Sequence, residues 1–166
     1  SDPVFIGILD HIRTSQAHVV DGIPCNCGRN GCWESYASAT ALIAQTKAKM
    51  KECPDSKMWE LCGGDINKVS GRTSFNAMYA GDEAGREVVE RYRYYVAVGI
   101  INIINIFQPE VLCVGGGISN EGDNLLDPIR EYVKKERYSK HAKKQTEICK
   151  AVLGNDAGII GAALLG

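Results

Sequence analysis

The sequence predicts an α/β fold, and four segments carry that prediction. Residues 82–107 repeat apolar side chains every three or four positions, the period of a helix that buries one face. Residues 110–114 form a short β-rich run that leads into three consecutive glycines. A further helix over 123–137 and a strand over 147–153 follow. Helices and strands that alternate through a glycine turn are typical of an α/β protein.

The segment before the long helix contains candidate strands and one predicted helix. Residues 1–24 show the weakest pattern, although the apolar runs at 4–9 and 17–20 are candidates for strands. Residues 34–51 contain no glycine or proline and predict a helix that ends before Pro54.

The sequence also predicts two short helices, a buried half of the long helix and a final helix. Residues 56–62 and 73–79 predict two short helices, and Thr73 is a candidate cap for the second. The long helix is apolar on nearly every side over 96–107, so we expect that half to be core. The segment 156–165 is rich in alanine and glycine and predicts a final helix.

Composition limits the kind of protein. The chain has 166 residues, 45% of them hydrophobic and 23% charged, which fits a single globular domain over 1–166. A formal net charge of -1 argues against a nucleic-acid groove built on bulk positive charge. No apolar run approaches the roughly 20 residues of a membrane span, and no secretory signal is recognisable. We therefore expect a cytoplasmic protein without membrane contact.

Three of the seven cysteines crowd into one short segment. Cys25, Cys27 and Cys32 lie on a glycine-containing loop, whereas the other four are scattered, with Cys113 in an apolar run typical of a core residue. Thiolates gathered so tightly repel one another unless they are protonated or bound to a cation, and Zn²⁺ is the usual cation. A reduced loop or a local disulfide is the alternative.

A histidine is the expected fourth ligand, because no fourth cysteine lies nearby. His18 precedes Cys25 by seven residues, with turn-forming glycine and proline between them. His11 is a weaker candidate, and His141 lies in a lysine-rich segment that indicates a surface position. A zinc ion with four protein ligands has no open position for water, so the site is expected to be structural.

Glu34 is a candidate binding residue directly after the cysteine cluster. It follows Cys32 by two residues and stands at the predicted start of a helix. Its carboxylate can accept hydrogen bonds from a ligand. Stabilisation of the helix start is the alternative role.

These residues resemble a known family. His18 and the segment 25–38, Cys-Asn-Cys-Gly-Arg-Asn-Gly-Cys-Trp-Glu-Ser-Tyr-Ala-Ser, resemble the zinc signature of the ROK family of bacterial sugar kinases and sugar-responsive repressors. The glucokinase branch is the most similar. The segments 114–119 and 154–163 resemble the nucleotide-side segments of that family, so the resemblance covers about 17–166.

The resemblance implies an actin-like, ribonuclease-H-like fold, of which this chain is the C-terminal lobe, with its zinc loop at 25–34. In that family ATP and sugar bind in a cleft between two lobes. The residues that match the zinc ligands are His18, Cys25, Cys27 and Cys32. His18 also contacts one sugar hydroxyl in that scheme, and Glu34 binds another. Homodimers are implied as well.

The same resemblance assigns the triple glycine to the nucleotide. Gly115, Gly116 and Gly117 would approach the adenosine side of ATP, which acts together with Mg²⁺. A glycine turn after a strand lets backbone reach a ligand without interference from side chains. A tight strand-to-helix turn without a ligand is the alternative interpretation.

Several features depart from the family pattern. The Asp-Gly-Gly-Thr phosphate segment and the Asn-Asp segment that supplies the catalytic base have no match here. Ala17 and Ser15 replace the usual glycine and glutamate before the zinc histidine, and the spacing to Cys25 is shorter. The isolated chain is therefore expected to be inactive.

The sequence favours a lobe of an ATP-dependent hexose kinase, with glucose as the expected sugar. The alternative is the sugar-sensing lobe of a ROK-type repressor, although the chain has no room for the helix-turn-helix of such proteins. A stand-alone interaction domain stabilised by zinc is a third hypothesis.

Overall fold

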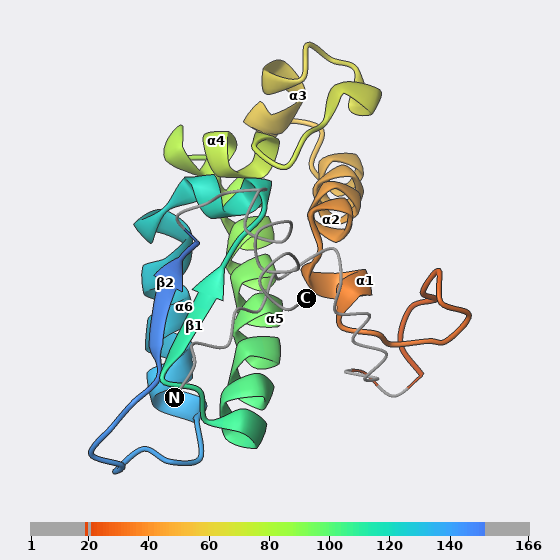
Figure 1. The fold of residues 1–166 in the computed structure, drawn as a ribbon. Coiled ribbons are helices and arrows are strands. Elements are labelled where there is room, and N and C mark those ends of the chain that lie inside the picture. The colour runs from red at the N-terminus through yellow and green to blue at the C-terminus, as the bar shows by residue number, and fades with distance from the viewer. Residues whose placement is uncertain (1–18, 20, 152–166) are drawn as a thin grey trace, which may run out of the picture. The chain divides into compact units, whose positions relative to one another are not determined.

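The computed structural model describes Val19 and residues 21–151 of the chain (Figure 1). The chain divides into two compact units, Ser15–Tyr95 and the combination of Ser1–Thr14 with Val96–Gly166. The strands expected at 4–9 and 17–20 and the helix expected at 156–165 fall wholly or mostly outside the described residues. Among the described residues, no helix is both long and apolar enough to cross a bilayer.

Helices build the described part of Ser15–Tyr95. They are α1 (Glu34–Ala37), α2 (Ala39–Glu52), α3 (Lys57–Leu61), the 3₁₀ turn η1 (Ile66–Lys68), α4 (Thr73–Tyr79) and the first half of α5 (Glu83–Phe107). The single helix expected over 34–51 is interrupted at Ser38. The extended backbone of Ser38 ends α1. The hydroxyl of Ser38 accepts a 3.0 Å hydrogen bond from the N–H of Ala41 at the start of α2.

A small apolar core holds α2, α3 and α4 together. Its buried members are Met50, Met58, Cys62, Val69 and Ala77. Thr73 was expected to cap α4, but it is the first residue of that helix. Its hydroxyl instead accepts a hydrogen bond from the N–H of Ser70 at 3.0 Å.

Asp82 connects the start of α3 to the start of α5. Its carboxylate accepts hydrogen bonds from the N–H of Gly85 and the hydroxyl of Ser56, each at 2.8 Å, and from the N–H of Lys57 at 3.2 Å. Burial of the carboxylate opposes its ionisation, but these donors outweigh that effect and lower the pKa of Asp82. The ionised carboxylate is thus part of the fold.

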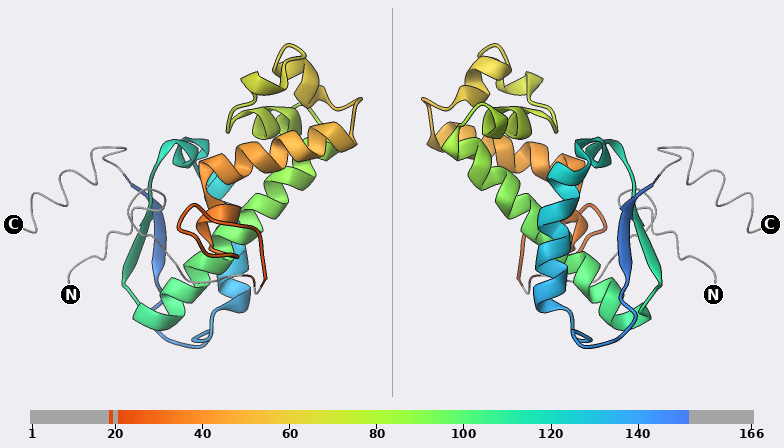
Figure 2. Two further views of the ribbon diagram at one scale, coloured as in Figure 1. Left: turned by 90° about the vertical axis from the view of Figure 1, so that its right-hand side faces the viewer. Right: turned by 90° about the vertical axis from the view of Figure 1, so that its left-hand side faces the viewer.

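The other unit contains a parallel strand pair covered by a helix. Its described elements are the second half of α5, β1 (Val111–Val114), η2 (Gly117–Glu121), α6 (Asp123–Glu136) and β2 (Glu147–Lys150). β1 and β2 pair in parallel, and α6 packs along β2 (Figure 2). The apolar face of α6 is buried through Leu125, Leu126, Ile129 and Val133. This arrangement confirms the predicted α/β fold.

Two predictions about apolar residues need correction. The α5 segment 96–107 is buried over most of its length, but Ile106 and Phe107 at its end are 60% and 68% exposed. Cys113, expected to be a core residue, is only half-buried, because it lies on the less covered face of β1 beside Cys149.

Candidate functional site

The cysteine loop, residues 21–33, folds back on itself before α1. The N–H of Cys25 donates to the carbonyl of Arg29 at 2.8 Å, and the N–H of Gly28 donates to the carbonyl of Cys25 at 3.0 Å. An isolated antiparallel bridge joins Pro24 to Asn30. These backbone contacts turn cysteines that are separated in sequence toward one side of the loop.

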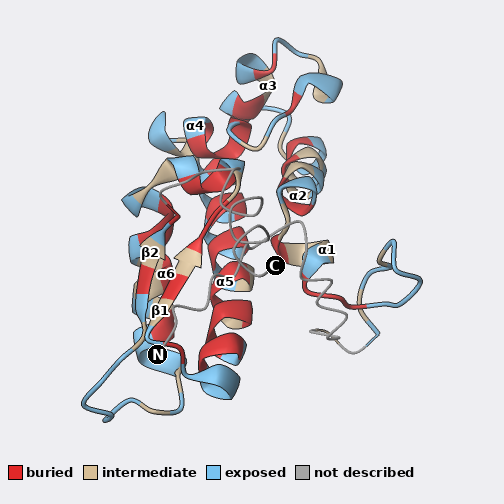
Figure 3. Cartoon of the chain, in the orientation of Figure 1, coloured by how far each residue is buried: buried red, intermediate tan, exposed pale blue. Residues whose placement is uncertain are grey.

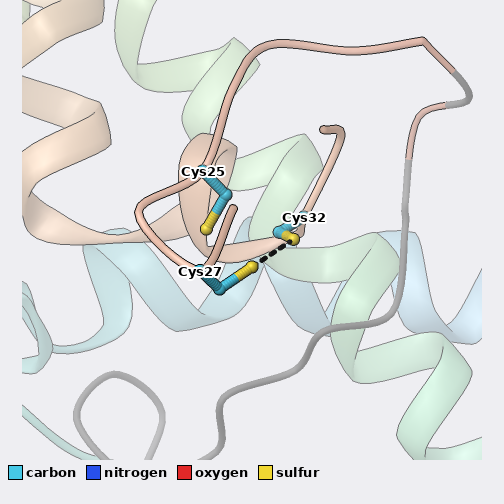
Figure 4. A group of neighbouring side chains, drawn as sticks. All are labelled: Cys25, Cys27 and Cys32. Carbon is cyan, nitrogen blue, oxygen red and sulfur yellow. Dashed lines mark hydrogen bonds between the residues drawn. The ribbon is translucent and has the colours of Figure 1, made fainter. Parts of the chain in front are cut away.

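The three thiols come together as the sequence predicts. The Sγ atoms of Cys25, Cys27 and Cys32 lie within 4.8 Å of one another, and those of Cys27 and Cys32 are 3.5 Å apart (Figure 4). Zn–S bonds of about 2.3 Å in a tetrahedron place sulfur atoms about 3.8 Å apart. The donor set therefore fits three corners of a tetrahedral zinc site.

The pKa values of the thiols in the cysteine loop shift in different directions. Hydrogen bonding with the backbone of Cys27, and then with the side chain of Ser35, lowers the pKa of the Cys25 thiol. The hydrogen bond with Cys27, together with burial, raises the pKa of Cys32 to about 11. A coordinated metal deprotonates such thiols outright, so a cation held by these sulfur atoms would displace the proton of Cys32.

Gly31 fixes the position of Val19 relative to the cysteine loop. Its φ is 73°, and a Cβ at this position would lie 1.8 Å from the carbonyl oxygen of Val19. The N–H of Val19 donates in turn to the carbonyl of Gly31 at 3.2 Å. Only glycine allows the Val19 carbonyl to come this close. Val19 is thus held beside Gly31, the residue directly before Cys32.

The histidine candidates have different outcomes. His18 and His11 lie outside the described residues. His141 is exposed, as expected for a surface residue.

Trp33 anchors the end of the cysteine loop to α5. Its side chain is buried, and its indole N–H donates to the carbonyl of Tyr95 at 2.7 Å. Tyr36, one turn further, places its ring 5.0 Å from that of Tyr95, and its hydroxyl accepts a hydrogen bond from Ile23 N at 2.8 Å. The roles of Trp33 and Tyr36 were not predicted from the sequence, although two aromatic residues directly after a cysteine cluster are typical of packing against a neighbouring helix.

Glu34 lies between these anchors with its side chain exposed. It is the first residue of α1, directly after Trp33. Figure 3 shows the change from the mostly exposed cysteine loop to the buried residues just before α1. Among the described residues, the hydrogen bonds and ion pairs include none from the Glu34 carboxylate. The contacts of Trp33 and Tyr36 thus hold the backbone on both sides of Glu34, and the Glu34 side chain is exposed.

The triple glycine forms a tight turn directly after β1. Gly116 has φ 84° and ψ 170°, a conformation that is essentially restricted to glycine. The hydroxyl of Ser119 donates to the carbonyl of Gly116 at 2.7 Å and closes the turn. A Cβ on Gly117 would meet no atom of the described residues within 4 Å. This turn and the cysteine loop lie in different compact units.

Known proteins resemble the chain along nearly its whole length. The ROK family matches residues 6–166. The glucokinase of Streptomyces coelicolor is 35% identical over 156 residues, which cover 92% of this chain and 48% of that protein. The xylose repressor of Bacillus subtilis is 26% identical over 157 residues, which cover 95% of this chain and 35% of that protein.

A solved structure extends the comparison to the fold. A ROK family glucokinase from Streptomyces griseus, in complex with glucose and AMPPNP, is similar with a TM-score of 0.79 and 31% identity. The match covers 90% of this chain and 48% of that one, so the chain spans about half the length of the glucokinases it matches. Such neighbours imply an actin-like ATPase fold. The chain belongs to the ROK family.

Proposed function

We propose that the full-length protein is an ATP-dependent sugar kinase that phosphorylates a hexose, with glucose as the expected substrate. The observation that carries this proposal is the convergence of three thiols on a loop that leads directly into an exposed, firmly anchored Glu34. Similarity to glucokinases, one of them solved with glucose and AMPPNP, supports it.

Glu34 is the proposed sugar ligand, together with His18. An ionised carboxylate accepts short, strong hydrogen bonds from hydroxyl groups, which a sugar presents in a fixed array. The indole bond of Trp33 and the ring contact of Tyr36 restrict the backbone on both sides of Glu34. Such restriction lowers the entropy lost when the carboxylate engages a ligand.

Zinc is the proposed organiser of this segment. Cys25, Cys27 and Cys32 would supply three ligands, and His18 is the proposed fourth, next in sequence to the hydrogen-bonded Val19. Four protein ligands leave no open position, so the ion would supply structure and take no part in phosphoryl transfer.

Gly115, Gly116 and Gly117 are the proposed contact with the adenosine side of ATP, with Mg²⁺ on its phosphates. Within the described part of the chain, no atom lies within 4 Å of a Cβ built on Gly117, which is compatible with backbone approach to a ligand. Phosphoryl transfer also needs a base for the sugar hydroxyl. The 166 residues contain no match to the family's base or phosphate segments, so we expect this chain alone to be inactive. The full-length protein is proposed to be a cytoplasmic homodimer without direct nucleic-acid contact.

Similarity to a xylose repressor supports one alternative, a sugar-sensing protein without catalysis. A coupled assay with ATP and glucose on the full-length protein separates the two. The kinase proposal expects turnover of about 1–100 per second, as in typical kinases. Glucose binding without any ADP production would instead favour the sensor.

A further inference from the structure

Two cysteines outside the cysteine loop face each other across the parallel strands. The register of β1 and β2 pairs Cys113 with Cys149, and their Sγ atoms are 3.1 Å apart. Both residues are half-buried, so their sulfur atoms are neither sealed in the core nor fully in solvent. In sequence they are 36 positions apart.

The backbone around the pair suits a covalent link. Neighbouring strands lie about 4.8 Å apart, within the Cα separation of roughly 4.4–6.8 Å that a disulfide spans. The flanking pairs Leu112↔Ile148 and Val114↔Lys150 hold the register on both sides. The two sulfur atoms therefore need to approach by only about 1 Å to reach the S–S bond length of about 2.05 Å.

We propose that Cys113 and Cys149 form a redox-active dithiol that a peroxide oxidises to an intrachain disulfide between β1 and β2. One thiol loses its proton, and the thiolate attacks one peroxide oxygen and becomes a sulfenic acid as the other oxygen leaves as water. The second thiol then attacks the sulfenic sulfur and releases a second water. Two thiols and one hydrogen peroxide thus give one disulfide and two waters, with two electrons passing to the peroxide.

The disulfide would reversibly restrict the strand that leads into the glycine turn. β1 runs from Cys113 through Val114 directly into Gly115–Gly117, so the disulfide would tie the base of that turn to β2. This inference rests on the strand pair alone and does not depend on the proposed kinase activity.

The reaction is expected to be slow at neutral pH. Burial raises the pKa of Cys113 to about 11, with further contributions from the Cys149 thiol and the Glu147 carboxylate. The thiolate, which is the reactive form, is therefore scarce near neutrality. A mildly alkaline buffer and hydrogen peroxide, the smallest peroxide, suit both the high pKa and the half-buried position.

The test treats the full-length protein with hydrogen peroxide, alkylates the remaining thiols and maps the peptides by mass spectrometry. We expect a linked peptide pair containing Cys113 and Cys149, lighter than the two reduced peptides by two hydrogen atoms, which dithiothreitol separates. Cys113→Ser and Cys149→Ser should each abolish it. Cys53→Ser is the matched control, because Cys53 is also half-buried, and it should leave the link intact.

The same samples give a second readout. A cross-link that fits the native register restricts the unfolded chain, so the thermal midpoint of the oxidised wild type should rise by several degrees, and that of Cys113→Ser should not. Two results would overturn the proposal: both cysteines still alkylated once Cys53 has been oxidised, or a linked pair whose formation lowers the midpoint. The peptides of the cysteine loop are separate and report on the zinc ligands independently.

Discussion

The indole N–H of Trp33 donates a 2.7 Å hydrogen bond to the backbone carbonyl of Tyr95 on α5. Trp33 stands between Cys32, the last thiol of the cluster, and Glu34, the proposed sugar ligand. This hydrogen bond thus fixes the short segment that contains both a proposed zinc ligand, Cys32, and the proposed sugar ligand, Glu34.

Trp33→Phe should weaken sugar use while keeping the metal. It removes the indole donor but keeps an aromatic ring, and a lost hydrogen bond of this kind costs about 0.5–1.5 kcal/mol. We expect a lower thermal midpoint and a higher KM for sugar. Trp59→Phe is the matched control, because its indole donates to the Met50 carbonyl at 2.9 Å. That variant should lose similar stability with unchanged KM; equal KM changes in both would contradict the assigned role.

Cys27→Ala should abolish metal binding. With only two thiols left, the loop lacks the donor set for a tetrahedral ion, and the folding energy that metal binding supplies is lost. Elemental analysis of wild-type protein purified without added metal should show about one zinc per chain. Cys53→Ala should keep its zinc, because Cys53 lies outside the cluster. Wild-type protein with three free thiols and no zinc would refute the metal site.

Two glycines of the cysteine loop should differ sharply in their tolerance of alanine. Gly28 and Gly31 both have positive φ, 84° and 73°. Among residues 19 and 21–151, a Cβ on Gly28 meets no atom within 4 Å, whereas one on Gly31 would collide with the Val19 carbonyl. Gly28→Ala should cost only the backbone strain, about 1–2 kcal/mol. Gly31→Ala should displace residue 19 and reduce zinc retention, measured by competition with a chelator; equal retention in both variants would contradict this geometry.

Asp82 should make stability depend on acid pH. Its folded-state pKa lies below the ordinary value of 3.8, so the stabilisation from the ionised carboxylate is fully present above that value. It is lost as the pH falls through the lower, folded-state pKa. Asp82→Ala should therefore destabilise by about 1–2 kcal/mol at neutral pH. Denaturant unfolding at several pH values should show this difference shrinking below about pH 4; a difference independent of pH would argue against an ionised Asp82.

Local signals account for the elements that the sequence predicts well. The helices expected over 82–107 and 123–137 are found as Glu83–Phe107 and Asp123–Glu136, because helix ends depend on nearby caps and breakers. The convergence of the three loop thiols was also predictable, since they lie close in sequence. The break at Ser38 was not, because a serine inside a helical pattern serves equally as a helix residue or as a cap.

Long-range relationships account for what was missed. The Cys113–Cys149 pair depends on the register of two parallel strands, which nothing local to either cysteine specifies. The contact between Trp33 and Tyr95 joins residues 62 positions apart. Periodicity shows which face of a helix is buried, but it does not show which distant side chain reaches that face.

Glu34→Gln tests the proposed sugar site, through sugar kinetics of the full-length protein with its zinc content verified. The substitution keeps the shape of the side chain and removes the charge-assisted hydrogen bond, worth about 1.5–3 kcal/mol. We predict a roughly ten- to a hundredfold loss in kcat/KM for glucose, with normal zinc content and little change in thermal midpoint. Glu60→Gln, at another exposed helical glutamate, should match the wild type. Unchanged sugar kinetics with a slightly lowered midpoint would show that Glu34 only stabilises its helix and is not a sugar ligand.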